Sequence, residues 1–317
     1  MRRRMKVNPA LGADQAAFAG ITTFMRQLAS RELAGVDVAI VGVPFDGGTT
    51  SYRSGTRFGP RKIRELSVIQ WGYNQALKVA PLDVLRVVDY GDVDVVLTDI
   101  EENIKSIAAE VGRILKAGPK IIALGGDHSI SYPLLRAHAR KYGPLAVVHF
   151  DAHTDCSREG VDHGTPFRQA IDDGLIDVDA FVQVGIRGPR AIPDAVEIAE
   201  GMGAKVLTID HCLEIGIPEV VRTVRAAMGS RRVYVSLDID ALDPAYAPAT
   251  GTPEVGGFTS YQMLQMVRGL RGLNLVGFDL VEVSPPYDNP GEITSVLAAN
   301  LAFEFLSLLA IGVEKGK

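Results

Sequence analysis

The segment Leu145-Ala146-Val147-Val148-His149-Phe150-Asp151-Ala152-His153-Thr154-Asp155 decides the fold of this chain. Its first six residues are mostly apolar and β-branched, which is typical of a strand buried on both faces of a parallel sheet. Asp151, His153 and Asp155 follow directly. Because open parallel sheets bind ligands beyond the carboxyl ends of their strands, the segment predicts a buried strand that leads into a functional site.

Two further segments repeat this arrangement of an apolar run followed by acidic or histidine side chains. Gly125-Gly126-Asp127-His128-Ser129 follows the run 121–124, and Asp238-Ile239-Asp240 follows the run 233–237. Since the carboxyl ends of parallel strands meet at one edge of the sheet, we expect the three segments to converge. One such segment alone is more often a turn or a helix cap, but three of them at strand ends indicate a site.

The residue types in these segments are those that bind divalent metal ions. Asp151, His153 and Asp155 alternate with other residues, as do Asp238 and Asp240, so an extended backbone would project each set to one side. Carboxylates with a minority of imidazoles suit hard or borderline divalent ions. The four carboxylates would balance the charge of two such ions. The predicted cofactors are therefore two Mn²⁺ per chain, with Ni²⁺ as the alternative.

The rest of the chain alternates short β-branched runs with amphipathic segments, and it contains no internal repeat and no linker-like stretch. This pattern predicts a three-layer α/β/α fold with a mostly parallel sheet of about eight strands. We expect a single domain over 1–317, with an N-terminal arm and helix over 1–34 and the α/β core over 35–317. The expected strands span 36–43, 85–90, 120–124, 144–150, 180–186, 204–209, 232–237 and 273–278, and the expected helices span 100–116, 131–141, 219–228 and 260–271.

The composition excludes several classes of protein. The chain has 317 residues, 47% of them hydrophobic, and a net charge of -5. It can bury a large core and lacks the basic excess typical of proteins that bind nucleic acid or anionic membranes, so we expect neither partner. Only two cysteines occur, and no apolar stretch follows the basic residues 1–6. These features favour a cytoplasmic protein with a small substrate.

The segment 293–313 is apolar and is nearly as long as the roughly 20 residues that span a bilayer. Asn300 and Glu304 interrupt it, and its apolar residues recur at helical spacing. We therefore predict a buried C-terminal helix rather than a membrane span.

Taken together, the three segments resemble the signatures of the ureohydrolase family, which includes arginases and agmatinases. The resemblance covers nearly the whole chain and continues through Gly42-Val43-Pro44-Phe45-Asp46, Arg57-Phe58-Gly59-Pro60 and Pro248-Ala249-Thr250-Gly251-Thr252-Pro253-Glu254. It implies hydrolysis of a guanidino compound to urea and an amine at a two-metal centre. It also implies that His128, Asp151, Asp155 and Asp238 hold one ion and that Asp151, His153, Asp238 and Asp240 hold the other.

The resemblance implies further roles in catalysis. Asp155 would carry a proton to the leaving amine as well as bind metal, and His163 would relay protons to solvent, for which an ordinary histidine pKa is suitable. Glu282 would clamp the guanidinium group through charge-assisted hydrogen bonds. Thr252 is a further substrate-binding candidate. His149, by contrast, is expected to pack or to hydrogen-bond to its neighbours without binding metal.

The substrate depends on the loop from Cys156 to Asp162, which joins a predicted ligand to His163. If Glu159 or Asp162 points into the site, an amine tail is favoured, as in agmatine. If Arg158 does, a carboxylate tail is favoured, as in guanidinobutyrate or guanidinopropionate. The loop lacks the asparagine and serine pattern of arginases. General likeness to agmatinases makes agmatine the first prediction, and an unusual guanidine or a biguanide stays open.

Two hypotheses that assign the chain a different kind of function compete with this prediction. The chain could be a metal-binding but catalytically silent partner subunit, which an altered ligand would support, although none is found. It could instead be a deacetylase of related architecture, which would hold one metal ion and use a tyrosine. The resemblance further implies a homo-oligomer, a trimer or a hexamer.

Overall fold

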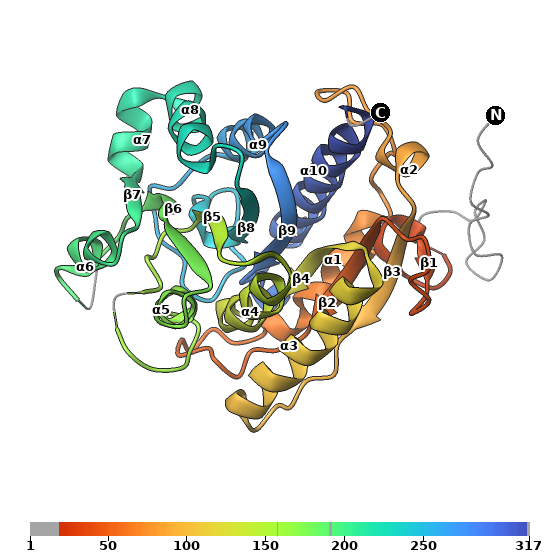
Figure 1. Cartoon of the computed structure of the whole chain (residues 1–317), viewed down its shortest axis with the longest axis horizontal. Helices are drawn as coiled ribbons and strands as arrows, with labels where there is room; N and C mark the ends of the chain where they lie inside the picture. The colour runs from red at the N-terminus through yellow and green to blue at the C-terminus, as the bar shows by residue number, and fades with distance from the viewer. Residues whose placement is uncertain (1–18, 157, 190–191, 316–317) are drawn as a thin grey trace.

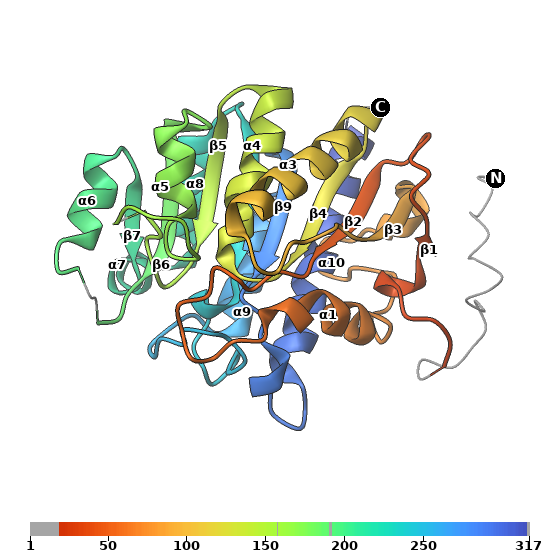
Figure 2. The same cartoon turned by 90° about the horizontal axis from the view of Figure 1, so that it is seen from below.

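The computed structural model describes residues 19–156, 158–189 and 192–315. Within them, a single sheet of nine strands runs in the order β1-β3-β2-β4-β9-β8-β5-β6-β7. Every neighbouring pair is parallel, and Figure 2 shows the strands ending at one edge. The strands are β1 (Leu28–Ala29), β2 (Val38–Val43), β3 (Val87–Asp92), β4 (Lys120–Gly125), β5 (Leu145–Phe150), β6 (Ile176–Ile186), β7 (Lys205–Thr208), β8 (Arg232–Asp238) and β9 (Asn274–Val281).

Helices cover both faces of this sheet (Figure 1), so the predicted three-layer fold is confirmed. One apolar core lies between the sheet and α1, α8, α9 and α10, and a second lies between the sheet and α3, α4 and α5. The α-helices are α1 (Gly59–Ser67), α2 (Pro81–Val84), α3 (Ile100–Ala117), α4 (Ser131–Tyr142), α5 (Pro166–Asp172), α6 (Ala195–Gly201), α7 (Ile209–Ile215), α8 (Ile217–Met228), α9 (Ser260–Gly269) and α10 (Ile293–Lys315).

The strands form where the apolar runs predict them, because a strand covered on both faces must be apolar on both. Every residue of β2 and β5 is buried. The additional strand is β1, which pairs through Leu28 and Ala29 with β3 at the edge of the sheet. Two residues are too few to carry a periodic signal, so the sequence predicted eight strands instead of nine.

The helix expected within residues 1–34 is not found in the part of that segment that the structure describes, and residues 1–18 lie outside it. Residues 19–34 hold a 3-10 turn, Phe24–Arg26, and β1. The backbone N–H of Phe24 donates to the carboxylate of Asp89 at 2.7 Å, and that of Met25 donates to Ser67 Oγ at 2.7 Å. The backbone N–H groups of Phe24 and Met25 are therefore satisfied by side chains distant in sequence and not by carbonyl groups of a helix.

Helix α10 is long and apolar enough to cross a membrane, but 78% of its most apolar window is buried inside the protein. Its Glu304 accepts hydrogen bonds from Arg268 Nε of α9 at 3.0 Å and from Asn74 Nδ2 at 2.9 Å. A buried carboxylate with two protein partners is suited to a core and not to a lipid surface. The prediction of a buried C-terminal helix is confirmed.

A close backbone approach at Gly126 fixes the turn after β4. The Gly126 N–H donates to Val43 O at 2.9 Å, and a Cβ at this position would lie 1.7 Å from Phe45 O. Only glycine fits there. The turn places the next residues, including His128, at the carboxyl edge of the sheet.

Replacement of Glu304 by alanine is expected to lower the free energy of unfolding by about 2 kcal/mol, because it removes charge-assisted hydrogen bonds to Arg268 and Asn74. The measurement is urea unfolding of the metal-free protein. Glu219→Ala is the matched control, since Glu219 pairs with Arg222 on an exposed helix surface and such pairs contribute about 0.2–1 kcal/mol. Equal losses in the two variants would contradict this account of α10.

Candidate metal centre

Four adjacent strands at the middle of the sheet, β4, β9, β8 and β5, bring the predicted site residues together. Each supplies a side chain at or just beyond its carboxyl end, as the sequence predicted. His128 lies in the turn after β4, Glu282 follows β9, Asp238 ends β8 with Asp240 in the next 3-10 turn (Ile239–Ala241), and Asp151, His153 and Asp155 follow β5.

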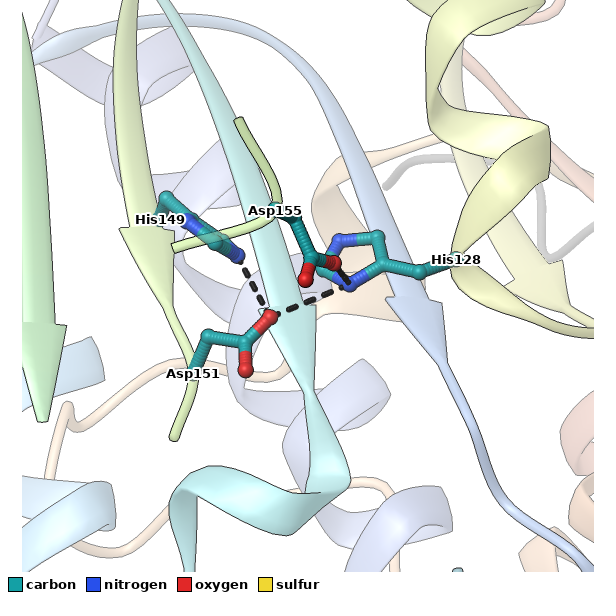
Figure 3. A group of neighbouring side chains, drawn as sticks. All are labelled: His128, His149, Asp151 and Asp155. Carbon is teal, nitrogen blue, oxygen red and sulfur yellow. Dashed lines mark hydrogen bonds and ion pairs between the residues drawn. The ribbon is translucent and has the colours of Figure 1, made fainter. Parts of the chain in front are cut away.

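The first cluster is centred on His128 Nδ1 (Figure 3). This atom lies 3.1 Å from Asp151 Oδ2, 3.0 Å from Asp155 Oδ2 and 3.2 Å from Asp238 Oδ2. All four side chains are buried. One imidazole nitrogen and three carboxylate oxygens therefore face a common point.

A second cluster shares Asp151. His153 Nδ1 lies 3.3 Å from Asp151 Oδ1 and 3.1 Å from Asp240 Oδ2, and these side chains are close enough to hold one metal ion. Asp151 thus presents Oδ2 to the first cluster and Oδ1 to the second. This is the arrangement expected of a carboxylate that bridges two ions.

The convergence arises from turns and not from extended alternation, so that part of the prediction is wrong. Strand β5 ends at Phe150, and Asp155 adopts a left-handed backbone conformation with φ 51°. Asp240 lies in a 3-10 turn, and its own N–H donates to the capping carboxylate of Asp238 at 2.8 Å. A left-handed backbone at a non-glycine residue, such as that of Asp155, is often found at functional sites.

In the neutral form of His128, the hydrogen bond at Nε2 leaves Nδ1 with a lone pair directed at the carboxylates. Ser236 Oγ donates to Asp279 Oδ1 at 2.6 Å, so it can only accept from His128 Nε2, which lies 2.9 Å away. In the neutral ring the proton is then on Nε2 and Nδ1 is free to bind a cation. Asp279 is an acidic residue inside the otherwise apolar and buried run 275–281, and that signal could have identified it from the sequence.

The electrostatics of the cluster also favour a cation. Burial, together with the charges of Asp240 and Asp151, raises the pKa of Asp238 well above its ordinary value. Burial lowers the pKa of His128, but hydrogen bonds to the surrounding carboxylates outweigh it and raise the pKa. A proton is therefore held where a metal ion would lie. The donor set fits two divalent ions.

Glu282 lies beside the clusters and is held in a strained backbone conformation with φ 63°. Its Oε1 accepts hydrogen bonds from the His128 N–H at 2.9 Å and from His163 Nδ1 at 3.0 Å. Its Oε2 is buried and has no hydrogen-bond partner among the described residues. Because a buried carboxylate oxygen is costly to leave unpaired, this atom is suited to a cationic ligand.

His163 is buried and does not have the ordinary pKa that the sequence suggested. Burial lowers its pKa, but the hydrogen bond to Glu282 and nearby carboxylates raise it to about 9. Its Nε2 lies 2.9 Å from Thr50 Oγ1. Two divalent ions in the adjacent clusters would oppose this rise, because positive charge disfavours the imidazolium.

A cavity of about 200 Å³ opens over the clusters. Of the predicted tail-binding residues, Arg158 and Thr252 line it, whereas Glu159 and Asp162 do not. The side chain of Glu159 is 90% exposed. The lining consists of His153, Thr154, Asp155, Arg158, His163, Gly164, Pro189, Ile192, Ala195, Asp238, Thr252 and Glu282.

Of the charged side chains in the loop after Asp155, which are Arg158, Glu159 and Asp162, only Arg158 lines the cavity. Its Nη1 and Nη2 donate to Asp162 Oδ2 and Oδ1 at 2.5 and 2.8 Å, and Asp162 also accepts from the Gly164 N–H at 2.8 Å. Of the five N–H groups of a guanidinium, three are left after these bonds. Pro189 and Ile192 add an apolar surface that the sequence did not single out.

Comparison with known proteins relates the chain to proteins of similar length. Residues 36–307 match the model of the arginase family. The chain is 45% identical to the mitochondrial agmatinase of Gallus gallus over 92% of its own length and 86% of the relative, and 44% identical to the guanidinopropionase of Pseudomonas aeruginosa over 95% and 96%. The solved structure of proclavaminate amidino hydrolase from Streptomyces clavuligerus matches with a TM-score of 0.89 and 41% identity, covering 94% of this chain and all of that one.

Metal-free protein is expected to lose thermal stability as the pH rises from 6.5 to about 9. The raised pKa of His163 means that its imidazolium stabilises the folded state fully below the unfolded pKa of about 6.5, and the contribution disappears as the pH passes the folded value. The raised pKa values of His128 and His153 act in the same direction. Calorimetry of chelator-treated protein across this window measures the effect.

Two comparisons control this measurement. His163→Asn should show a flatter dependence on pH than the unmodified protein. Added Mn²⁺ should raise the melting temperature more at the high end of the window, because the ligands must be deprotonated to bind it. A melting temperature of the metal-free protein that rises with pH would show that the clusters do not hold protons as described.

Proposed function

Because the chain belongs to the arginase family, we propose that it hydrolyses an ω-guanidino acid, releasing urea and the corresponding amino acid. Hydrolysis of a C–N bond is the activity that the family and the relatives share. Membership of this family removes the deacetylase reading. The choice of a guanidino acid rests on one observation, the position of Arg158 in the cavity wall.

The residues of the two clusters would hold two metal ions. Mn²⁺ is the proposed ion and Ni²⁺ the alternative. Bound ions would activate water as a nucleophile and stabilise negative charge as the guanidinium carbon is attacked. The ligands proposed for one ion are His128, Asp151, Asp155 and Asp238, and those proposed for the other are Asp151, His153, Asp238 and Asp240.

Glu282 is proposed to bind the guanidinium group of the substrate. Glu282 lines the cavity, and its Oε2 is buried and unpaired, while Oε1 is fixed by His128 and His163. A carboxylate held in this way can accept charge-assisted hydrogen bonds without losing side-chain entropy on binding. It would orient the guanidinium carbon toward the clusters.

Asp155 and His163 are proposed to move protons. Both line the cavity and both are buried, so a proton taken up by Asp155 can pass to the leaving amine without exchange with bulk solvent. His163 contacts Thr50 on one side and Glu282 on the other. These two contacts support a role in which His163 passes protons outward from the site.

Arg158 is proposed to bind the carboxylate of the substrate tail, because it lines the cavity and its bonds to Asp162 leave further N–H groups to donate. The apolar side chain of Ile192 would contact the methylene groups between the two charged ends. Agmatine is the second candidate. It is favoured by the similarity to an agmatinase, and no inward-facing acidic group of the 156–162 loop supports it.

We also propose a cytoplasmic homo-oligomer, a trimer or a hexamer. The low cysteine content and the composition support the location, and the resemblance supports the assembly. Sedimentation velocity of the purified protein tests the latter.

Urea release is expected to be fastest from guanidinobutyrate or guanidinopropionate when the protein is loaded with Mn²⁺. Agmatine, arginine, guanidine and biguanides complete the panel, and Ni²⁺ loading is run in parallel. A preference for agmatine would overturn the guanidino acid proposal while retaining the activity. No urea from any compound would favour a catalytically silent subunit.

Replacement of Arg158 by glutamine should raise KM for guanidino acids by about tenfold, because the loss of one charge-assisted hydrogen bond weakens binding by about that factor. KM for agmatine, which has no carboxylate, should be nearly unchanged. Arg168→Gln removes the same charge from a residue that pairs with Asp172 and does not line the cavity. Equal effects of the two variants on KM would remove Arg158 from substrate binding.

Replacement of Glu282 by glutamine should lower kcat/KM by about 10- to 100-fold, since it removes a charged partner of the guanidinium group. Glutamine has the same side-chain length as glutamate, so the substitution should not change the left-handed backbone conformation at position 282. Glu159→Gln is the control, because its side chain is exposed, and it should leave kcat/KM unchanged. Unaltered kinetics in Glu282→Gln would refute the clamp.

A further inference from the structure

His149 and Gln183 form a buried pair behind the first cluster. They lie directly opposite each other on the neighbouring strands β5 and β6, and both are completely buried. Gln183 Nε2 lies 3.0 Å from His149 Nδ1, and His149 Nε2 lies 2.7 Å from Asp151 Oδ2. A continuous row of hydrogen bonds therefore ends on the carboxylate that the two clusters share.

The orientation of the Gln183 amide follows from a backbone carbonyl. Gln183 Nε2 also lies 2.6 Å from Thr154 O. A carbonyl oxygen can only accept, so the NH₂ group and not the oxygen of the amide must face it. Gln183 Oε1 in turn is buried without a hydrogen-bond partner among the described residues. The amide thus uses both of its donors, one on Thr154 and one on His149.

This orientation fixes the tautomer of His149. Since Gln183 donates to Nδ1, that atom must carry the lone pair, and the proton of the neutral ring is on Nε2. The N–H at Nε2 then points at Asp151 Oδ2. A nitrogen that carries a proton and donates it cannot bind a metal ion, although His149 is close enough to the other ligands for a metal site to include it.

Neighbouring aromatic side chains fix the orientation of the His149 ring. His149 packs against Phe167, with ring centroids 4.0 Å apart, and against Phe181 at 6.5 Å. Asp151 is held on its other side by the His153 N–H, which donates to Oδ1 at 2.5 Å. Each oxygen of the carboxylate therefore has one fixed donor and keeps lone pairs directed at one cluster.

We propose that Gln183 and His149 are positioning residues that orient Asp151 so that it can bridge two metal ions, with His149 as an obligatory hydrogen-bond donor and not a ligand. The proposal rests on the proposed two-metal centre. The role of these two residues is to position a metal ligand, and it does not depend on which substrate the protein hydrolyses.

The tautomer can be read directly by long-range ¹H–¹⁵N correlation on protein labelled at histidine, in the metal-free form and loaded with diamagnetic Zn²⁺. The chain has only six histidines, and the resonances of His149 are assigned by their loss in His149→Gln. We expect a protonated Nε2 and an unprotonated, hydrogen-bonded Nδ1 in both forms. In Gln183→Met, Nε2 should stay protonated, and the Nδ1 signal should move toward that of a free lone pair.

Metal affinity provides the second measurement, by competition of Mn²⁺ between the protein and a fluorescent chelator. His149→Phe should weaken Mn²⁺ binding by about 10- to 100-fold, the usual cost of losing a partner of a metal ligand. His149→Gln should bind nearly as well as the unmodified protein, since its amide nitrogen can occupy the place of Nε2. Phe181→Leu is the control, because it disturbs packing on His149 and leaves the hydrogen bonds intact; its affinity should be unchanged.

Three outcomes would overturn the proposal. The first is a proton on Nδ1, the second is loss of the Nε2 proton on Zn²⁺ loading, which would make His149 a ligand, and the third is unchanged Mn²⁺ affinity in His149→Phe. Should that variant fail to fold, the tautomer of the unmodified protein and the Nδ1 shift in Gln183→Met decide. Fewer than two ions bound by unmodified protein would instead refute the metal centre itself, which distinguishes the two failures.

Discussion

The mutual repulsion of buried carboxylates is the constraint on which the site depends. Asp151, Asp238 and Asp240 are almost inaccessible to water, and two unit charges 4 Å apart repel by about 4 kcal/mol at a protein interior's effective dielectric constant. Without cations, the folded chain relieves this repulsion with protons, as the raised pKa values of Asp238 and His128 indicate. The cage is therefore stable only when positive charge occupies it.

The surrounding structure holds these groups in place against both repulsion and backbone strain. Asp155 and Glu282 have left-handed backbone conformations, and each is fixed through its main chain: the Phe167 N–H donates to Asp155 O at 3.2 Å, and the Glu282 N–H donates to Gly126 O at 2.9 Å. Behind the cage, Ser236 orients His128 and His149 contacts Asp151. Rigid, fully bonded neighbours of this kind allow a site to keep its geometry as charge changes during a reaction.

Much of the fold and of the site could be predicted because both rest on local patterns. An apolar run such as 145–150 is read as a buried strand wherever it occurs, and parallel strands bring their carboxyl ends to one edge. The site residues after β4, β5 and β8 followed from that rule. Strand β1 could not be predicted, because two residues carry no period and their pairing with β3 depends on the finished sheet.

The sequence by itself determined the fold class, the edge of the sheet where the site lies and the residue types that fit divalent metal. Tertiary structure decided where individual side chains point and what surrounds them. It determines which oxygen of Asp151 faces which cluster and that Arg158 and not Glu159 lines the cavity. It also buries His163 and raises its pKa. The physical reason is that these properties arise from contacts between residues far apart in the chain. Spacing along one strand determines neither a turn's conformation nor a hydrogen-bond partner on another strand.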